Sequence, residues 1–193
     1  MNKLFIIILV IFLAGCSPPS NKNPHIIIYT TLGEIEVELF PQQAPKTVTA
    51  FLSFVDSGYF NNSSFYRVVL AEGLSTSLNV GLIQGGIWQT KDQQSPAMPG
   101  IEHESTNQTG LSHTTGTISL ARTAPGTANT EFFICIGDQS QFDYGNTNPA
   151  DEQGFAAFGR VSKGMSIVRT IQVQTKQGES FVPKINIKKI ERL

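Results

Sequence analysis

Short runs of β-branched and aromatic residues, separated by turn signals, constrain the fold of this chain more than any other feature. The first run covers residues 25–30 and is followed by Leu32-Gly33, a turn signal. Acidic and apolar residues then alternate strictly over residues 34–39, which is typical of a strand with one buried face. The two segments together predict a β-hairpin at the start of a folded domain.

Two predicted helices and six further predicted strands follow this hairpin. An apolar stripe at helical spacing between Pro45 and Gly58 predicts one helix, and residues 163–170 predict a second. Seven or eight short strands with two helices indicate a mainly β domain, a closed antiparallel barrel that leaves no strand edge exposed. The further predicted strands are residues 64–69, 82–85, 117–121, 131–136, 155–161 and 185–188.

The balance of charges excludes several classes of protein. The chain of 193 residues has 14 basic and 15 acidic side chains, so its net charge of −1 provides no basic surface for nucleic acid. Charged residues make up 15% of the chain, below the roughly 25% of ordinary soluble domains. This composition disfavours a coiled coil, a disordered tail and a protein with several membrane spans.

The N-terminus has the pattern of a targeting signal. An apolar run covers residues 4–13 and is shorter than the about 20 residues that span a bilayer. Leu13-Ala14-Gly15-Cys16 resembles the lipobox of bacterial lipoproteins, which implies cleavage before Cys16 and attachment of lipid to its sulfur. An ordinary cleaved signal with an incidental cysteine is the alternative. We expect a lipoprotein signal peptide at residues 1–15, a lipidated Cys16 with a flexible tether at residues 16–25, and one domain at residues 26–193.

The only other cysteine, Cys135, lies inside an apolar run and is expected to be a buried, inert thiol. No pattern of metal ligands or activated nucleophiles stands out in the sequence. His103 and His113 lie near Glu102 and Glu104, but they lack the spacing of helical metal ligands. No nucleophile elbow or phosphate-binding loop is recognisable either. We therefore expect neither a metal nor a cofactor.

Five short strings combine arginine, glutamine and aromatic residues in one order along the chain. They are Phe-Tyr-Arg-Val-Val at residues 65–69, Ile-Gln-Gly-Gly at 83–86, Ile-Ser-Leu-Ala-Arg at 118–122, Glu-Phe-Phe-Ile-Cys at 131–135 and Gly-Phe-Ala-Ala-Phe-Gly-Arg-Val at 154–161. From about residue 27 to the C-terminus, these strings resemble the cyclophilin family of peptidyl-prolyl cis-trans isomerases. The resemblance implies a closed eight-stranded antiparallel β-barrel capped by two α-helices. It also implies an enzyme that accelerates X–Pro bond rotation, and the lipobox-like N-terminus implies that its substrates are folding extracytoplasmic proteins.

The resemblance assigns roles to single residues. Arg67 is expected to stabilise the twisted amide without covalent chemistry, and Gln84 to orient the substrate backbone and support Arg67. Phe133 is expected to form the floor of a proline pocket, while Phe132, its neighbour on the strand, faces the core. The substrate-binding residues that the resemblance implies are Phe65, Leu82, Ala121, Arg122, Glu131, Phe133, Phe142 and Phe155.

The same resemblances define the expected partners and location. The partners are proline-containing unfolded or flexible polypeptides and a membrane, which the protein reaches through the lipid on Cys16. Nucleic acid is not an expected partner. We expect a monomer outside the cytoplasm, lipid-anchored to a bacterial cell membrane on its periplasmic side or at the cell surface.

Several positions depart from the family pattern. Gly81 stands where the family usually has phenylalanine, which removes one aromatic wall. Glu131 stands where a glutamine is common, and its carboxylate is open to pairing with Arg67 or with Arg122. Phe155 stands where many members have histidine or tyrosine and offers packing alone.

Residues 71–79 resemble an insertion, and Trp88 is expected to be structural. The departures motivate a second hypothesis, a non-catalytic proline-peptide-binding or chaperone module on the same fold. A third hypothesis, a barrel that encloses a small ligand, is disfavoured by the family resemblance.

Overall fold

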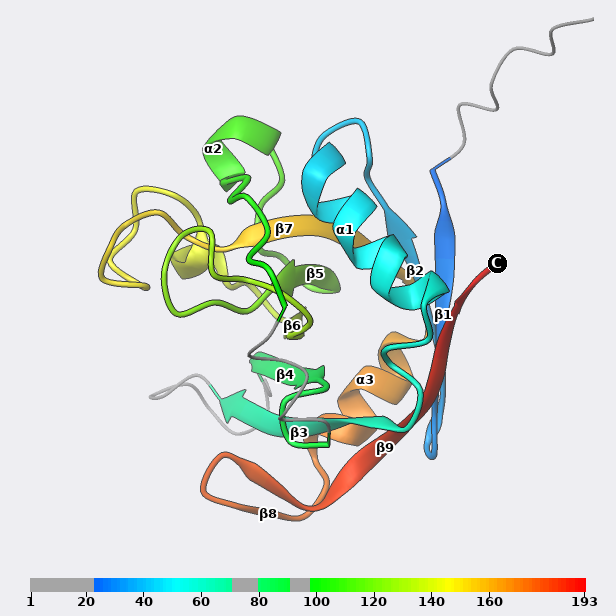
Figure 1. The fold of residues 1–193 in the computed structure, drawn as a ribbon. Coiled ribbons are helices and arrows are strands. Elements are labelled where there is room, and N and C mark those ends of the chain that lie inside the picture. The colour runs from blue at the N-terminus through cyan, green and yellow to red at the C-terminus, as the bar shows by residue number, and fades with distance from the viewer. Residues whose placement is uncertain (1–22, 71–79, 91–97) are drawn as a thin grey trace, which may run out of the picture.

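The computed structural model describes residues 23–70, 80–90 and 98–193, whose regular secondary structure is mainly β-strand (Figure 1). The strands are β1 (His25–Thr30), β2 (Gly33–Leu39), β3 (Ser63–Leu70), β4 (Gly81–Gly86), β5 (Thr117–Leu120), β6 (Phe132–Ile136), β7 (Ala156–Lys163), β8 (Lys176–Gln177) and β9 (Ser180–Arg192). The helices are α1 (Pro45–Asp56), α2 (Thr106–Thr109) and α3 (Met165–Gln172), and a 3-10 turn, η2, covers Ser140–Phe142.

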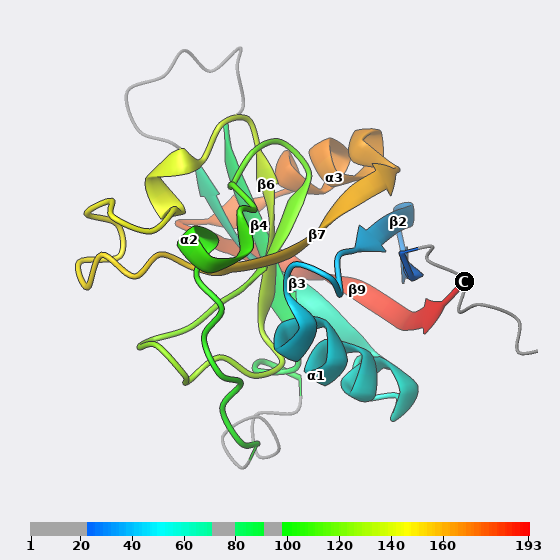
Figure 2. The same cartoon turned by 90° about the horizontal axis from the view of Figure 1, so that it is seen from above.

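Eight of these strands form a closed antiparallel barrel. Their hydrogen-bonded order is β1-β2-β7-β5-β6-β4-β3-β9, and β1 also pairs with β9, which closes the cylinder. The two-residue β8 pairs with the start of β9 and adds a short hairpin. Figure 2 shows α1 and α3 on opposite sides of the strands. The predicted eight-stranded barrel is confirmed, and α2 is a short helix in addition to the two that were predicted.

The first hairpin and the first helix follow their sequence signals. β1 and β2 pair around a tight turn in which Thr30 lies opposite Gly33. Helix α1 begins at Pro45 and buries its predicted apolar stripe against the barrel. Gly58 then adopts a φ of 68°, in the left-handed region, and its N–H donates to the carbonyl of Val55. These signals are local, so the sequence could place both elements correctly.

The second helix and the last strand differ from their predicted bounds. Lys163 still pairs with Glu36 of β2, so β7 continues to Lys163. Gly164, with a φ of 92°, then turns the chain, and α3 begins after it. Strand β9 is longer than the alternating segment at residues 185–188, because it pairs with β1 along one part and with β3 and β8 along another.

Two clusters of apolar side chains lie on opposite faces of the sheet. The main core fills the barrel, where the ring of Phe51 from α1 lies 5.8 Å from that of Phe132. Phe133 follows Phe132 on β6 but belongs to a second cluster on the outer face, which confirms the predicted alternation. This outer cluster consists of Leu82, Phe133, Cys135 and Phe142, with Val69, Ala121 and Phe155 packed against it.

Cys135 is fully buried in the outer cluster, as predicted. Burial raises the pKa of its thiol, and the nearby charge of Asp143 raises it further. A thiol in this environment stays protonated at neutral pH, which makes it a weak nucleophile. The cysteine is therefore a packing residue.

The acidic and histidine residues that lie close together in sequence have structural partners. The carboxylate of Glu104 accepts hydrogen bonds from the backbone N–H groups of Lys46 and Thr47, at 3.1 and 2.7 Å, and so caps the start of α1. His103 Nε2 lies 3.0 Å from the carbonyl oxygen of Gln153. Within the described ranges, no three His, Cys, Asp or Glu side chains are grouped to hold a metal ion.

Candidate active site

Two adjoining cavities lie on the outer face of the barrel, beside β3, β4 and β6. Arg67, Gln84, Ala121 and Arg122 line both cavities, so that the two form one groove. The large cavity, of about 460 Å³, is also lined by Tyr66, Trp88, Thr123, Thr127, Asn129 and Glu131. The small cavity, of about 230 Å³, is also lined by Val69, Leu82, Phe133, Phe142, Asn148 and Phe155.

Three aromatic rings make the floor of the small cavity. The rings of Phe133, Phe142 and Phe155 pack edge to face, with centroids 5.3 to 5.8 Å apart. Leu82 from β4 belongs to the same cluster. Because these side chains present only carbon atoms, the small cavity suits a compact apolar group.

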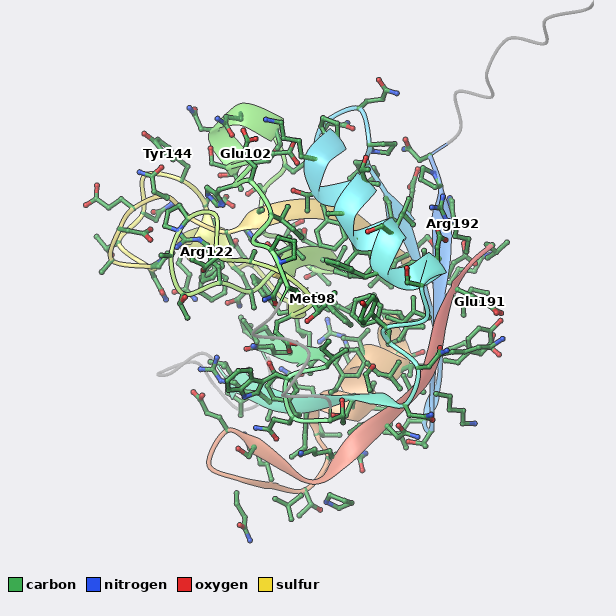
Figure 3. All side chains as sticks on the ribbon, viewed as in Figure 1. Met98, Glu102, Arg122, Tyr144, Glu191 and Arg192 are labelled. Carbon is green, nitrogen blue, oxygen red and sulfur yellow. The ribbon has the colours of Figure 1, made fainter. Side chains whose placement is uncertain are left out.

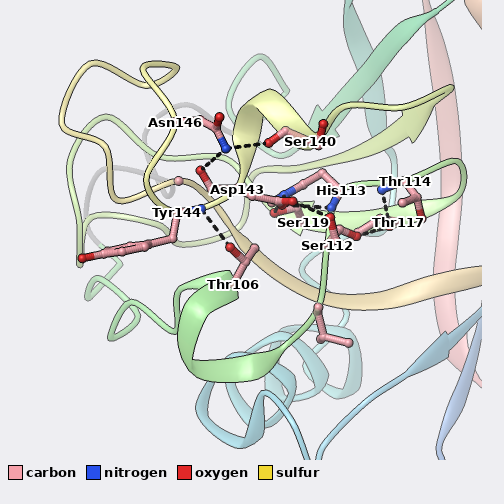
Figure 4. Close-up of polar contacts among 12 residues, drawn as sticks. Thr106, Ser112, His113, Thr114, Thr117, Ser119, Ser140, Asp143, Tyr144 and Asn146 are labelled. Atoms are coloured by element: carbon pink, nitrogen blue, oxygen red, sulfur yellow. Dashed lines mark hydrogen bonds and ion pairs between the residues drawn. The ribbon is translucent and has the colours of Figure 1, made fainter.

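His113, which packs against this floor, belongs to a group of hydrogen-bonded residues that Figure 4 shows. His113 stacks on Phe133, with ring centroids 5.9 Å apart. Its Nδ1 lies 2.6 Å from Asp143 Oδ1, and its Nε2 lies 3.0 Å from Ser119 Oγ. Burial acts to raise the pKa of Asp143, but hydrogen bonds from His113 and Ser112 lower it below its ordinary value overall. His113 and Ser119 are both 0% exposed, so this arrangement holds the floor in place and does not meet a substrate.

Arg67 reaches the groove because β3 is irregular at Tyr66. In a regular strand, Phe65 and Arg67 would share one face. The pairing of β3 with both β4 and β9 shifts register between these two residues, which marks a β-bulge. Tyr66 and Arg67 therefore both line the large cavity, whereas Phe65 points into the main core against Phe132. The expectation that Phe65 binds substrate is corrected, because its side chain is 0% exposed.

Two residues hold the guanidinium of Arg67. Its Nε donates to Glu179 Oε2 at 2.8 Å, its Nη2 forms an ion pair with the same oxygen at 2.7 Å, and its Nη1 donates to Gln84 Oε1 at 3.0 Å. Glu179 lies in the turn between β8 and β9, and its carbonyl also accepts from the N–H of Val68 at 2.8 Å. The hairpin is thus fixed to β3 beside Arg67. A guanidinium has five N–H donors on three nitrogen atoms. Each of the three nitrogen atoms of Arg67 makes one of these contacts.

Glu131 pairs with neither of the two arginines that the sequence offered as partners. Its Oε2 accepts from the hydroxyl of Tyr66 at 2.7 Å. Its Oε1 accepts from the backbone N–H groups of Ile87 and Trp88, both at 2.9 Å, and from the hydroxyl of Thr130 at 3.1 Å. Burial raises the pKa of Glu131 above its ordinary value, although these hydrogen bonds oppose the effect.

Arg122 ties the groove to the loop at residues 151–154. Its Nη1 and Nη2 donate to the two carboxylate oxygens of Asp151 at 2.6 and 2.8 Å, and its Nε donates to the carbonyl of Gly154 at 2.9 Å. The guanidinium also lies 5.2 Å from the ring centroid of Phe155. Arg122 lowers the pKa of Asp151 to about 2. Figure 3 shows Arg122 on the side of the molecule away from Arg192 of β9.

Two glycines beside the groove are required by close packing. A Cβ at Gly81, whose φ is +154°, would lie 2.0 Å from the carbonyl oxygen of Val69. Position 81 therefore cannot carry the phenylalanine of the family pattern without a shift of β3. A Cβ at Gly86 would lie 2.4 Å from a carboxylate oxygen of Glu131, so Gly86 makes room for that side chain.

The structure brings the predicted site residues together, apart from Phe65. Cys16 and residues 71–79 lie outside the described residues. Besides the lining residues Val69, Thr123, Thr127, Asn129 and Asn148, the sequence did not predict three residues at or beside the groove, namely Tyr66, Trp88 and Glu179. Tyr66 was hidden by the expectation of regular alternation, and Trp88, expected to be structural, lines the large cavity with 49% of its surface exposed. Glu179 is 112 residues from Arg67 in sequence, and no local signal connects the two.

Comparison with known proteins identifies the class of protein to which this fold and groove belong. Residues 25–192 match the family model "Cyclophilin type peptidyl-prolyl cis-trans isomerase/CLD". Peptidyl-prolyl cis-trans isomerase A of Dickeya dadantii (strain 3937) is 34% identical over 174 residues, which are 88% of this chain and 84% of that protein. Peptidyl-prolyl cis-trans isomerase B of Escherichia coli (strain K12) is 32% identical over 148 residues, covering 76% and 83% of the two chains. The chain belongs to the cyclophilin-type peptidyl-prolyl cis-trans isomerase family.

The chain is accordingly an isomerase that acts on X–Pro bonds. The crystal structure of a Cryptosporidium parvum cyclophilin-type isomerase has the same fold, with a TM-score of 0.69 and 22% identity over 89% of this chain and 98% of that one. A second structure of that protein, in the presence of the dipeptide Ala-Pro, gives a TM-score of 0.67 at 22% identity.

Proposed function

We propose that the groove binds an X–Pro segment with the proline ring in the small cavity, and that Arg67 accelerates rotation of the X–Pro bond. The observation that carries this proposal is the position of Arg67 and Gln84, which line both cavities. A peptide that spans the groove passes its X–Pro bond beside the guanidinium. The related structure with Ala-Pro supports a proline peptide as the ligand class.

The proposed chemistry needs no nucleophile. The X–Pro bond resists rotation with a barrier of about 18–20 kcal/mol because its C–N bond has partial double-bond character. Uncatalysed exchange takes tens to hundreds of seconds. Shortening it roughly 10⁴-fold requires about 5.4 kcal/mol of transition-state stabilisation.

A guanidinium can supply part of this stabilisation. It stays protonated at physiological pH, so it is always a hydrogen-bond donor. When the bond twists, conjugation is lost and the lone pair of the prolyl nitrogen becomes localised, so that it accepts a hydrogen bond from Arg67. Because the planar amide lacks that acceptor, the interaction favours the transition state over the ground state. Gln84 keeps the guanidinium in place through its 3.0 Å hydrogen bond.

An NMR exchange experiment on an Ala-Pro peptide tests this role. Arg67→Ala should lower the catalysed exchange rate roughly 10²-fold and leave peptide affinity nearly unchanged. Arg160→Ala is a matched control, because Arg160 is exposed on β7 and does not line the groove. An Arg67→Ala enzyme with the wild-type exchange rate contradicts the proposal.

We also propose that the isomerase acts outside the cytoplasm from a lipid anchor on Cys16. The lipobox-like sequence before Cys16 supports this location. The start of the barrel is compatible with such a tether. The carbonyl of His25 accepts a hydrogen bond from the backbone N–H of Leu193. Leu193 follows Arg192, which lies on the side of the molecule away from Arg122 and the groove. Among the described residues, no helix combines the length and apolarity needed to cross a bilayer.

Cell fractionation tests the anchor. The protein should partition with membranes, and mass spectrometry should find an acylated Cys16 at its N-terminus. Cys16→Ser should abolish both the acylation and the membrane fraction, whereas Cys135→Ser should leave both unchanged. A wild-type protein without lipid on Cys16 contradicts this part of the proposal.

A further inference from the structure

A continuous chain of hydrogen bonds leads from Arg67 to a buried carboxylate. Arg67 Nη1 donates to Gln84 Oε1 at 3.0 Å, and Gln84 Nε2 donates to the hydroxyl oxygen of Tyr66 at 2.8 Å. The hydroxyl of Tyr66 donates to Glu131 Oε2 at 2.7 Å. Tyr66 is 6% exposed, and Glu131 is partly buried in the floor of the large cavity.

The direction of this chain is fixed at both of its ends. A guanidinium only donates, so the Gln84 amide must turn its oxygen towards Arg67. An ionised carboxylate only accepts, so the single hydroxyl proton of Tyr66 must be donated in the hydrogen bond to Glu131. The hydroxyl oxygen of Tyr66 then faces Gln84 as an acceptor and requires the amide NH₂ on that side. The two ends impose the same orientation on Gln84, and every bond in the chain is satisfied.

We propose that Tyr66 and Glu131 are positioning residues of this isomerase, which fix the amide orientation of Gln84 and thereby the guanidinium of Arg67. The inference rests on the proposed role of Arg67. Neither Tyr66 nor Glu131 needs to touch the reacting bond, since both act through Gln84. The bulge in β3 is what makes this possible, because it places Tyr66 and Arg67 together beside the large cavity.

The backbone around Glu131 determines what an amide would do at this position. Oε1 of Glu131 accepts from Ile87 N–H, Trp88 N–H and the Thr130 hydroxyl. Two of these groups are backbone donors that cannot reverse. In Glu131→Gln, the side-chain oxygen must therefore stay at this site, and the new NH₂ group takes the place of Oε2, facing Tyr66.

The isosteric Glu131→Gln substitution should therefore reverse the chain. The new NH₂ donates to Tyr66, whose proton is then directed at Gln84. To accept it, Gln84 turns its oxygen to Tyr66 and its NH₂ to Arg67, where two donors oppose each other. Although glutamine is common at this position in the family pattern, here it should lower kcat roughly tenfold, with KM changed less than about twofold.

Tyr66→Phe should suppress this effect. Without the hydroxyl, no proton can be directed at Gln84, whatever residue occupies position 131. Gln84 keeps its orientation from Arg67 alone, and kcat should fall only about two- to threefold. The double variant should match Tyr66→Phe, so that adding a second substitution makes the Glu131→Gln enzyme faster.

The experiment measures kcat and KM of the four enzymes of this cycle by NMR exchange on an Ala-Pro peptide, together with thermal unfolding to establish that each is folded. Glu102→Gln is the matched control, because Glu102 is exposed and pairs with Lys46 away from the groove. The proposal predicts suppression, which a merely structural role of Glu131 does not produce.

Three outcomes overturn the inference. They are a Glu131→Gln enzyme with wild-type kcat, a double variant slower than Glu131→Gln, and a loss confined to KM. Arg67→Ala, measured alongside, separates this inference from the proposed function. If Arg67→Ala is slow while Glu131→Gln is not, the positioning role alone fails. If Arg67→Ala retains the wild-type rate, the proposed role of Arg67 fails.

Discussion

The contact between Glu179 and Arg67 joins the β8–β9 turn to the groove, and removing the carboxylate tests what this contact contributes to catalysis. In Glu179→Ala, Nε and Nη2 of Arg67 lose the partner that they have at 2.8 and 2.7 Å, while Nη1 keeps Gln84. The two side chains are 44% and 53% exposed. An ion pair with this exposure stabilises a fold by only about 0.2–1 kcal/mol. The stability of the variant should therefore be nearly unchanged.

The effect of Glu179→Ala on kcat should be larger than its effect on stability. Ordering a free arginine side chain costs up to about 2 kcal/mol of rotamer entropy. Without Glu179, the side chain of Arg67 is only partly ordered before the reaction. If ordering it in the transition state costs half of that entropy, the barrier rises by about 1 kcal/mol, and kcat falls roughly fivefold. Glu179→Gln keeps an oxygen acceptor without the charge, so its kcat should lie between those of the wild type and Glu179→Ala.

The assay is NMR exchange on an X–Pro peptide, combined with urea unfolding. Glu102→Ala is the matched control, because it removes another exposed ion pair, that with Lys46, outside the groove. It should have a similarly small effect on stability and none on kcat. A Glu179→Ala enzyme that turns over as fast as the wild type, or faster, refutes the reasoning, because Arg67 would then not need this partner.

Three further substitutions test other parts of the structure. Phe133→Ala removes a ring that is 3% exposed and packs on three others, so urea unfolding should show a loss of about 3–5 kcal/mol; a loss below about 1 kcal/mol contradicts this packing. Gly81→Ala should lower Tm, because its Cβ would lie 2.0 Å from Val69 O, and an unchanged Tm would show that β3 yields easily. Because the pKa of Asp143 is lowered, its carboxylate stabilises the fold at pH values above 3.8, the ordinary pKa. This stabilisation is lost as the pH falls through the lowered pKa of the folded protein. Asp143→Asn should therefore lose less stability between pH 5 and pH 2 than the wild type, as followed by circular dichroism, and parallel curves would argue against the role of Asp143.

Regular local patterns determined much of the fold from the sequence alone. The alternation at residues 34–39 gave one buried face to β2, and the helical stripe with Gly58 behind it placed α1. The same alternation separated Phe132 from Phe133, one in the core and one at the floor of the small cavity. These features depend on neighbours in the chain, whose geometry is set by the backbone period.

The groove residues were predicted in a different way. Their identity came from the order of short strings that resemble one family, and the structure brings Arg67, Gln84 and Phe133 to one groove. The prediction failed at Phe65, because the bulge beside it arises from pairing with β4 and β9. No property of the residues next to Phe65 records that pairing.

The partners of charged groups were decided by the tertiary structure. The sequence offered Arg67 and Arg122 as partners for Glu131, yet the folded chain gives it Tyr66 and two backbone N–H groups. Arg67 instead pairs with Glu179, which only the β8–β9 turn brings near. A carboxylate accepts from whichever donors the fold places within about 3 Å of it. The sequence therefore determined which chemical groups are present, and the pairing of distant strands determined which of them meet.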